Sequence, residues 1–384
     1  MKMALGALAL ALIVAAAALV PIQPYLDFQV LFHANMGLLR GIPLYDRAGQ
    51  VGMIAQLAGV PAAQVYVLPF PYPPWYALST IWLARLPVDA AARVWFGLNL
   101  LMLVVSSILL TSRQPIIRRV LISLAAVFWL PALGSLFVGQ YGLPVLLGAA
   151  LMVRALKDEK PAMLALAAAL LTFKPHLGLA ILLLVIALLL SRRDRFSREA
   201  TLGMLAAATV LFGLGFLASP RWPMEYAGSL ISFQGVHGVT ECTQCVSLPA
   251  MAGRLVAGGL GTAAWISLGL AMLTCGWMAW RWKTLRTRPS ALVAMGALAT
   301  LLVSPYLLNY DYLMLLVPFI ALAGEIRSPG AWIVLALAYI LPPAALALLG
   351  SAGNPSLIIS TCIVLVLTLR RLDGPAGMPV RSTA

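Results

Sequence analysis

Apolar runs long enough to cross a membrane recur along nearly the whole chain. Runs such as 90–111, 200–218 and 330–349 reach or approach the ~20 residues that a helix needs to cross the hydrocarbon core of a bilayer. Only 10% of the 384 residues are charged and 62% are hydrophobic, whereas about 25% of the residues of a soluble domain are charged. Because so few charges cannot cover a surface that faces water, the sequence predicts an all-α polytopic membrane protein.

The formal net charge of +14 comes largely from short basic clusters between the apolar runs. Clusters in such positions mark the cytoplasmic loops of membrane proteins. We therefore expect both termini in the cytoplasm, and no binding of nucleic acid, which a soluble protein of this charge would suggest. The clusters are Arg113, Arg118 and Arg119; Arg154, Lys157 and Lys160; Arg192, Arg193, Arg195 and Arg198; Arg281, Lys283, Arg286 and Arg288; and Arg370 and Arg371.

The apolar runs predict one membrane domain, residues 1–384, with about twelve spanning helices (roughly eleven to thirteen). If segment 74–87 also crossed the membrane, the number of crossings would be odd and the termini would lie on opposite sides. We therefore expect this segment to dip into the bilayer or lie flat on it. The connections 23–73 and 219–260 are then long outer loops, and 370–384 is a short cytoplasmic tail. Within the first loop, residues 27–40 predict a helix that lies at the membrane interface.

Asp27 is the most informative acidic residue of the predicted outer face. It lies just beyond the first apolar run, where a carboxylate can face water while its neighbours stay in lipid. There it could take a proton from an acceptor hydroxyl as a general base. An aspartate that opens a helix is also a common N-cap, and both interpretations remain open.

Lys174-Pro175-His176 interrupts a long apolar stretch. Ionisable residues at such a depth are costly and mark a functional site by default. If 161–191 is a hairpin, Lys174 and His176 lie at its outer tip, where they could bind a lipid phosphate. The alternative is a lysine that extends toward the membrane surface beside a proline turn.

Other outer segments hold polar residues next to helix breakers or close to one another. Asp311 follows a proline break between two apolar runs, so it could orient a sugar or a metal, or cap the next helix. Gln140 lies in a glycine turn, where it could bind a sugar or its own backbone. Cys242 and Cys245 form a C-x-x-C motif, which predicts a local disulfide or two free thiols in preference to a redox centre or a zinc site.

Several of these segments follow one another in a characteristic order. They are Asp27-Phe28, Tyr45-Asp46, Tyr72-Pro73-Pro74, Gly139-Gln140, Lys174-Pro175-His176, Ser304-Pro305-Tyr306 and Tyr310-Asp311-Tyr312. This order resembles glycosyltransferase family 87, over about residues 25–325. The chain differs from the family pattern at Asn309 and at Cys245.

The resemblance implies a GT-C-like helical bundle in the cell (inner) membrane, with interfacial helices in the first outer loop. It implies transfer of a mannose- or arabinose-like sugar from a polyprenyl-phosphate donor to a glycolipid, glycan or protein acceptor on the periplasmic side. If one base takes the acceptor proton while the hydroxyl attacks the anomeric carbon from the face opposite the phosphate, the transfer inverts the configuration at that carbon. Asp27 is implied as the catalytic base. No cofactor is firmly implied, and Mg²⁺ or Mn²⁺ is an open alternative. The substrate-binding candidates are Lys174, His176, Arg40, His33, Tyr72, Gln140 and Asp311.

Two other functions remain open at this point. A secondary transporter would use Lys174, His176 and Asp311 near the bilayer midplane, on broken helices of two repeated halves. No matching break is evident in a second half of the sequence. A non-catalytic lipid-binding subunit is the other alternative, because membership of a fold family does not by itself establish activity.

Overall fold

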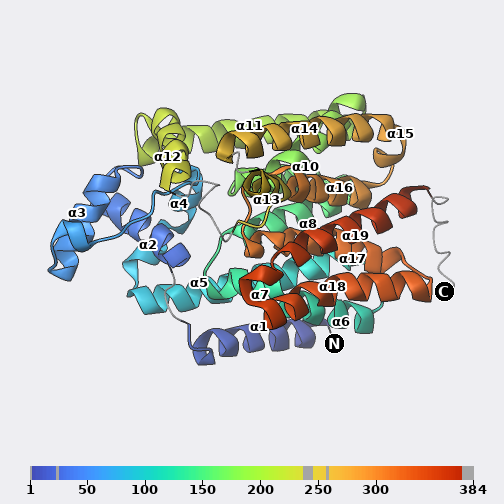
Figure 1. Cartoon of the computed structure of the whole chain (residues 1–384), viewed down its shortest axis with the longest axis horizontal. Helices are drawn as coiled ribbons and strands as arrows, with labels where there is room; N and C mark the ends of the chain where they lie inside the picture. Colours follow the sequence, from blue (N-terminus) through green and yellow to red (C-terminus); the bar gives the residue numbers. More distant parts are fainter. Residues whose placement is uncertain (1, 23–25, 237–244, 257–258, 374–384) are drawn as a thin grey trace.

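The computed structural model describes residues 2–22, 26–236, 245–256 and 259–373, and every regular element within them is a helix (Figure 1). The α-helices of the first half are α1 (Lys2–Leu19), α2 (Leu26–Leu39), α3 (Arg47–Ala58), α4 (Pro74–Thr80), α5 (Val88–Leu110), α6 (Ile116–Val127), α7 (Leu130–Phe137), α8 (Gly142–Asp158), α9 (Pro161–Leu171) and α10 (Pro175–Ser191). The α-helices of the second half are α11 (Arg195–Ala218), α12 (Trp222–Val236), α13 (Leu248–Leu255), α14 (Gly259–Trp280), α15 (Trp282–Leu285), α16 (Pro289–Val303), α17 (Leu316–Glu325), α18 (Pro329–Leu349) and α19 (Pro355–Asp373). Short 3₁₀ helices are η1 (Ala62–Gln64), η2 (Ile81–Arg85), η3 (Asn309–Leu315) and η4 (Gly350–Gly353). The all-α prediction is confirmed.

Five helices are long and apolar enough to cross a membrane, counted over the described residues. They are α5, α11, α19, the part of α14 from Gly261 to Trp280, and α18 continued to Gly353. Shorter apolar helices of 10–17 residues are α9, α10 and α16. A membrane protein is therefore supported, but the predicted count of about twelve spans is not confirmed.

The apolar run 116–136, predicted as one span, is broken. It forms α6 and α7, whose axes differ by 60°, and counting them as one span raises the number of candidates to six. Pro131 lies in the first turn of α7, and proline lacks the amide hydrogen that would continue the hydrogen bonds of α6. Trp129, between the two helices, is fully buried, so the break lies inside the protein.

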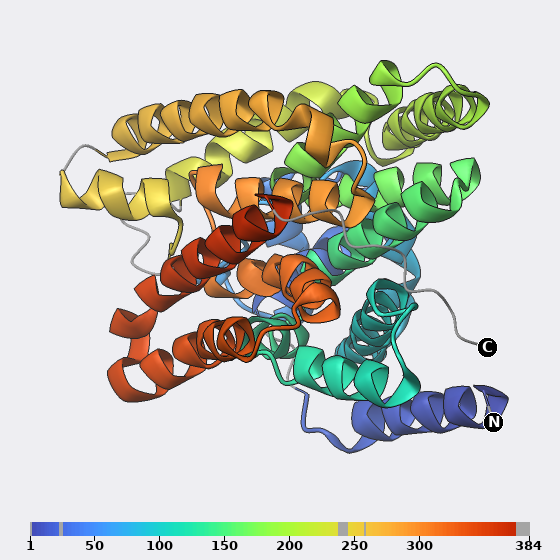
Figure 2. The same ribbon diagram turned by 90° about the vertical axis from the view of Figure 1, so that its right-hand side faces the viewer.

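The spanning candidates show apolar side chains outward, opposite to the pattern of a soluble protein. Leu217 of α11 is 75% exposed and Leu273 of α14 is 72% exposed. Figures 1 and 2 place α1 and α14 on opposite sides of the molecule. Such apolar faces are stable against lipid, where no polar cover is needed.

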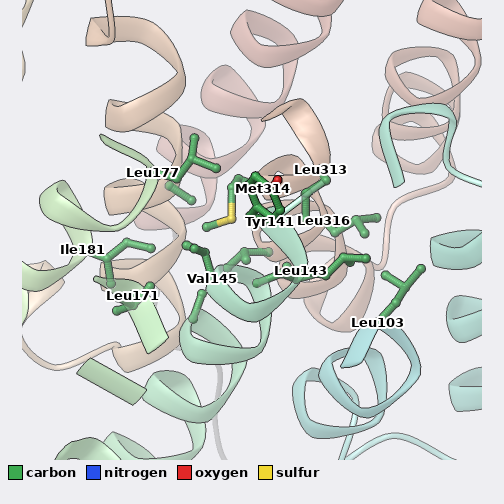
Figure 3. Close-up of a cluster of buried hydrophobic side chains, with 14 of the residues drawn as sticks. Leu103, Tyr141, Leu143, Val145, Leu171, Leu177, Ile181, Leu313, Met314 and Leu316 are labelled. Carbon is green, nitrogen blue, oxygen red and sulfur yellow. The ribbon is translucent and has the colours of Figure 1, made fainter. Parts of the chain in front are cut away.

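The interior is formed by helices that are buried nearly all round. In α8 most side chains are buried, and in α16 every residue from 292 to 301 is buried. Figure 3 shows the centre, where leucine, isoleucine and valine side chains of α5, α8, α10 and α17 meet. This packing places the beginnings of α8 and α10 next to η3, where the candidate site lies.

The two predicted outer loops contain helices of their own. Residues 27–40 were expected to form a helix, and α2 covers nearly that range. Segment 74–87, expected to dip into the bilayer or lie flat on it, forms the short α4 and η2; which of the two it does stays a prediction. The connection 219–260 contains α12 and α13, and residues 374–384 of the predicted tail lie outside the described residues.

Candidate active site

Four polar side chains that are far apart in the sequence meet in one cluster. Lys174 Nζ lies 2.5 Å from Asp311 Oδ1 and 3.1 Å from Gln140 Oε1. The Gln140 side chain is in turn hydrogen-bonded to Asp27. Lys174 is 3% exposed, Asp311 1% and Gln140 1%, so the charges are held almost entirely out of solvent. We call Asp27, Gln140, Lys174 and Asp311 the polar cluster.

The chemistry of its neighbours determines the orientation of the Gln140 amide. A lysine ammonium only donates hydrogen bonds, and an ionised carboxylate only accepts them. The Gln140 oxygen therefore faces Lys174 and its NH₂ group donates to the Asp27 carboxylate. Gln140 connects the buried ion pair to the aspartate that the sequence singled out.

Each member of the polar cluster lies where a helix begins. Asp27 is in the first turn of α2, Gln140 precedes α8 by two residues, Lys174 is the N-cap residue of α10, and Asp311 is in the first turn of η3. The N-terminal end of an α-helix carries about half a positive elementary charge. This arrangement stabilises the carboxylates and favours an anionic ligand.

A glycine turn positions Gln140. Gly139 has a φ of +72°, in the left-handed region where side chains with a Cβ are strained. A Cβ at this position would lie 2.7 Å from Phe28 Cβ, so only glycine allows α2 to approach this closely. Trp95 Nε1 donates to Gly139 O at 3.0 Å, and the Tyr141 hydroxyl donates to the backbone oxygen of Asp27.

Local structure also positions the buried ion pair. Pro175 starts α10 directly after Lys174, and a Cβ at Gly178 would lie 2.1 Å from the Leu171 carbonyl oxygen, so α9 and α10 meet tightly at this break. Asp311 Oδ2 accepts a hydrogen bond from Leu308 N at 3.0 Å while Oδ1 binds Lys174. Asp311 therefore both caps η3 and forms the ion pair.

The surroundings of Asp27 make its carboxylate a stronger base than an ordinary aspartate. Burial raises the pKa of the Asp27 carboxyl above its usual value, because a low-dielectric environment disfavours the charged form. The hydrogen bond from Gln140 and the charge of Lys174 oppose this increase, and the charge of Asp311 adds to it. A base is most effective when its pKa lies near the working pH.

Aromatic rings enclose the polar cluster. The Tyr72 ring packs edge-on against Tyr141 with centroids 4.5 Å apart, and Tyr141 packs against Tyr76 at 5.0 Å. Lys174 Nζ lies 5.1 Å from the centroid of the Tyr310 ring, an attractive cation–π geometry. Tyr72 was predicted from the sequence, whereas Tyr141 and Tyr310 were not, although each adjoins a predicted residue.

The remaining predicted binding residues lie outside the polar cluster. His176 is exposed in the first turn of α10. It interacts electrostatically with both Lys174 and Asp311. His33 is half-buried and packs edge-on against Phe32. Arg40 is exposed after the end of α2; thirteen residues at 1.5 Å rise per residue separate it from Asp27 by roughly 20 Å.

The predicted disulfide involves a residue that the structure leaves out. Cys242 lies outside the described residues, so its pairing with Cys245 stays a prediction. Cys245 itself is buried beside Ala250 and Ala263.

The side chains present do not fit a divalent cation. Over the described ranges, no group of three or more His, Cys, Asp or Glu side chains is placed to hold one. In the polar cluster the Lys174 ammonium already neutralises Asp311, and it would repel a second cation. We therefore assign no chemical step to Mg²⁺ or Mn²⁺.

Residues 70–305 match the model of glycosyltransferase family 87, which is more than half of the 384 residues. This match is narrower than the predicted range of about 25–325; it includes Gln140 and Lys174 and excludes Asp27 and Asp311. No curated protein matches the chain.

Proposed function

We propose a specific transfer reaction for this chain, which belongs to glycosyltransferase family 87. The donor is a polyprenyl-phosphate sugar, with a mannose- or arabinose-like residue, and the acceptor is a hydroxyl of a glycolipid, glycan or protein. The bundle is of GT-C type in the inner membrane, with the polar cluster facing the periplasm. The observation that carries the proposal is the convergence of Asp27, Gln140, Lys174 and Asp311 from four separate segments.

Asp27 acts as the general base. It removes the proton of the acceptor hydroxyl while that oxygen forms a bond to the anomeric carbon, and the bond from this carbon to the phosphate oxygen breaks on the opposite face. The configuration at the anomeric carbon is inverted. Polyprenyl phosphate leaves as an anion, so no second carboxylic acid is needed to protonate it, in contrast to the carboxylate pair of glycosidases.

Lys174 stabilises the departing phosphate. An ammonium group has three N–H donors; one is directed to Asp311 and one to Gln140, which leaves the third for a phosphate oxygen. The beginnings of α8 and α10 add partial positive charge at the same place. A preorganised cation in a site shielded from water stabilises charge that develops in the transition state.

The donor class can be tested with the purified full-length protein in liposomes. We expect transfer of radiolabelled sugar from a polyprenyl-phosphate donor and none from the corresponding nucleotide sugar, because the leaving group must be held at membrane depth. Labelled product is measured by extraction and chromatography of the acceptor fraction. Equal transfer from the nucleotide sugar would contradict the proposed donor.

The pH dependence of transfer reports on Asp27. The base must be deprotonated, so kcat/KM is expected to rise with pH through the raised pKa of Asp27. The acidic limb of the profile should therefore lie above 3.8, the ordinary value for this carboxyl. An acidic limb at or below 3.8 would show that a group other than Asp27 is titrating.

A further inference from the structure

An apolar groove is lined by side chains of α6, α17 and α18 and includes no residue of the polar cluster. The three helices are labelled in Figure 1. The volume of the groove is about 220 Å³, larger than the ~150 Å³ apolar cavity that is known to bind benzene. One face of each helix lines it. The lining includes Ile122 and Ala125 of α6, Phe319 and Ile320 of α17, and Ala336 and Ile340 of α18.

The groove offers no free polar group to a ligand. Its lining has two side chains with hydrogen-bonding atoms, and both are satisfied: the Tyr339 hydroxyl donates to Ala125 O at 2.6 Å, and Trp332 Nε1 donates to Ile326 O at 3.2 Å. Ile340 is 55% exposed, so the groove opens to the outer surface of α18, a candidate membrane span. A hydrocarbon chain fits such a wall, and a polar ligand does not.

One end of the groove is basic. Arg118 lies one helical turn before Ile122, on the face of α6 that lines the groove. Its guanidinium donates to the backbone oxygen of Ala323, and its Cζ lies 5.4 Å from the centroid of the Trp332 ring. A guanidinium has five N–H donors, so several remain for an anion.

The arginines at this end are not neutralised by acidic side chains. Arg119 Nε is buried without a hydrogen-bond partner. None of the seven ion pairs found among the described residues contains Arg118 or Arg119. The acid of this end, Glu325, is paired with Arg371. Basic pockets between membrane helices bind anionic lipid headgroups.

We propose that the groove binds one acyl chain of an anionic phospholipid, whose phosphate lies against Arg118 and Arg119. The direction of the groove argues for a phospholipid and against the sugar donor. Leu316, at the end of the groove nearest the polar cluster, directly follows η3, and Ala323, at the basic end, lies about 10 Å further along α17. A sugar donor whose phosphate is bound at Lys174 would have its headgroup at the Leu316 end of the groove, and not at the basic end beside Arg118.

The bound acyl chain would pack against residues that contact Trp129, which in turn contacts η3. Trp129 packs against two lining residues, with centroid distances of 5.3 Å to Phe319 and 4.9 Å to Tyr339. Its Nε1 donates to Tyr312 O at 3.5 Å, next to Asp311. A ligand that binds only the folded state raises its stability, so occupancy should raise the unfolding temperature.

The test is a thermal unfolding titration of the full chain in detergent with dioleoyl-phosphatidylglycerol, and with dioleoyl-phosphatidylcholine as the matched zwitterionic lipid. We expect phosphatidylglycerol in large excess to raise the unfolding midpoint by about 5 °C, and phosphatidylcholine to have little effect. Arg118→Gln should raise the phosphatidylglycerol concentration needed for half of the shift by about fivefold, the effect of one basic residue on an anionic lipid. Ala336→Leu fills the groove at an exposed helix position and should reduce the response while the protein stays folded.

Arg195→Gln is the matched control, because Arg195 is 88% exposed on another helix and pairs with Glu199. It should leave the lipid response unchanged. Equal midpoints with both lipids would overturn the proposal, as would an unchanged response in both Arg118→Gln and Ala336→Leu. Displacement of bound phosphatidylglycerol by polyprenyl phosphate in native mass spectrometry would also overturn it, since the groove would then belong to the donor.

Discussion

Replacement of Asp27 with asparagine is expected to lower kcat for sugar transfer by about 10²- to 10⁴-fold, the usual contribution of a general base. Asparagine has the same shape, and its side-chain oxygen can still accept the hydrogen bond that Gln140 donates to Asp27. It cannot take the proton of the acceptor hydroxyl. The rate is measured with the full-length protein in liposomes under donor saturation, with the unfolding midpoint recorded on the same preparation.

Two further variants make the Asp27 experiment decisive. Asp46→Asn is the matched control in the same loop: Asp46 caps α3 by accepting from Gly49 N at 3.0 Å, which asparagine also does, so transfer should be unchanged. Asp27→Glu keeps a carboxylate but displaces it, and should retain part of the activity. Full activity of Asp27→Asn, with a normal unfolding midpoint, would rule out Asp27 as the base.

The sequence predicted the members of the polar cluster but not their contacts. Asp27, Gln140, Lys174 and Asp311 each stood out as a polar residue of the predicted outer face beside a glycine, a proline or the end of an apolar run. Ionisable residues at membrane depth are costly and mark functional sites. That Lys174 pairs with Asp311, 137 positions further along, depends on how α10, α16 and η3 pack. Nothing in the local pattern specifies that packing.

Other features could not be read from local patterns for different reasons. Arg40 was named as a substrate-binding candidate, yet α2 separates it from Asp27 by roughly 20 Å along the helix axis. The apolar run 116–136 has the length of one span, but Pro131 lets the chain turn by 60° and bury Trp129. The composition of a segment shows that it is apolar. The direction in which its helices run depends on how they pack against the rest of the protein.

The buried ion pair gives the second large expected effect. Lys174→Met removes the cation and leaves the Asp311 carboxylate 1% exposed without its counter-ion, which typically costs about 3–5 kcal/mol. We expect the unfolding midpoint to fall by several degrees and sugar transfer to be lost. The surface variant Arg195→Met, which breaks the exposed pair with Glu199, is the matched control and should change neither, because exposed ion pairs contribute little.

The double variant Lys174→Met with Asp311→Asn separates the structural role of Lys174 from its role in transfer. Asparagine at 311 carries no charge, and its side-chain oxygen can still accept from Leu308 N, so most of the lost stability should return. The phosphate would still lack its cation, so sugar transfer should stay lost while the unfolding midpoint recovers. If transfer returned together with stability, Lys174 would serve only to compensate Asp311, and the helix N-termini of α8 and α10 would have to stabilise the departing phosphate without it.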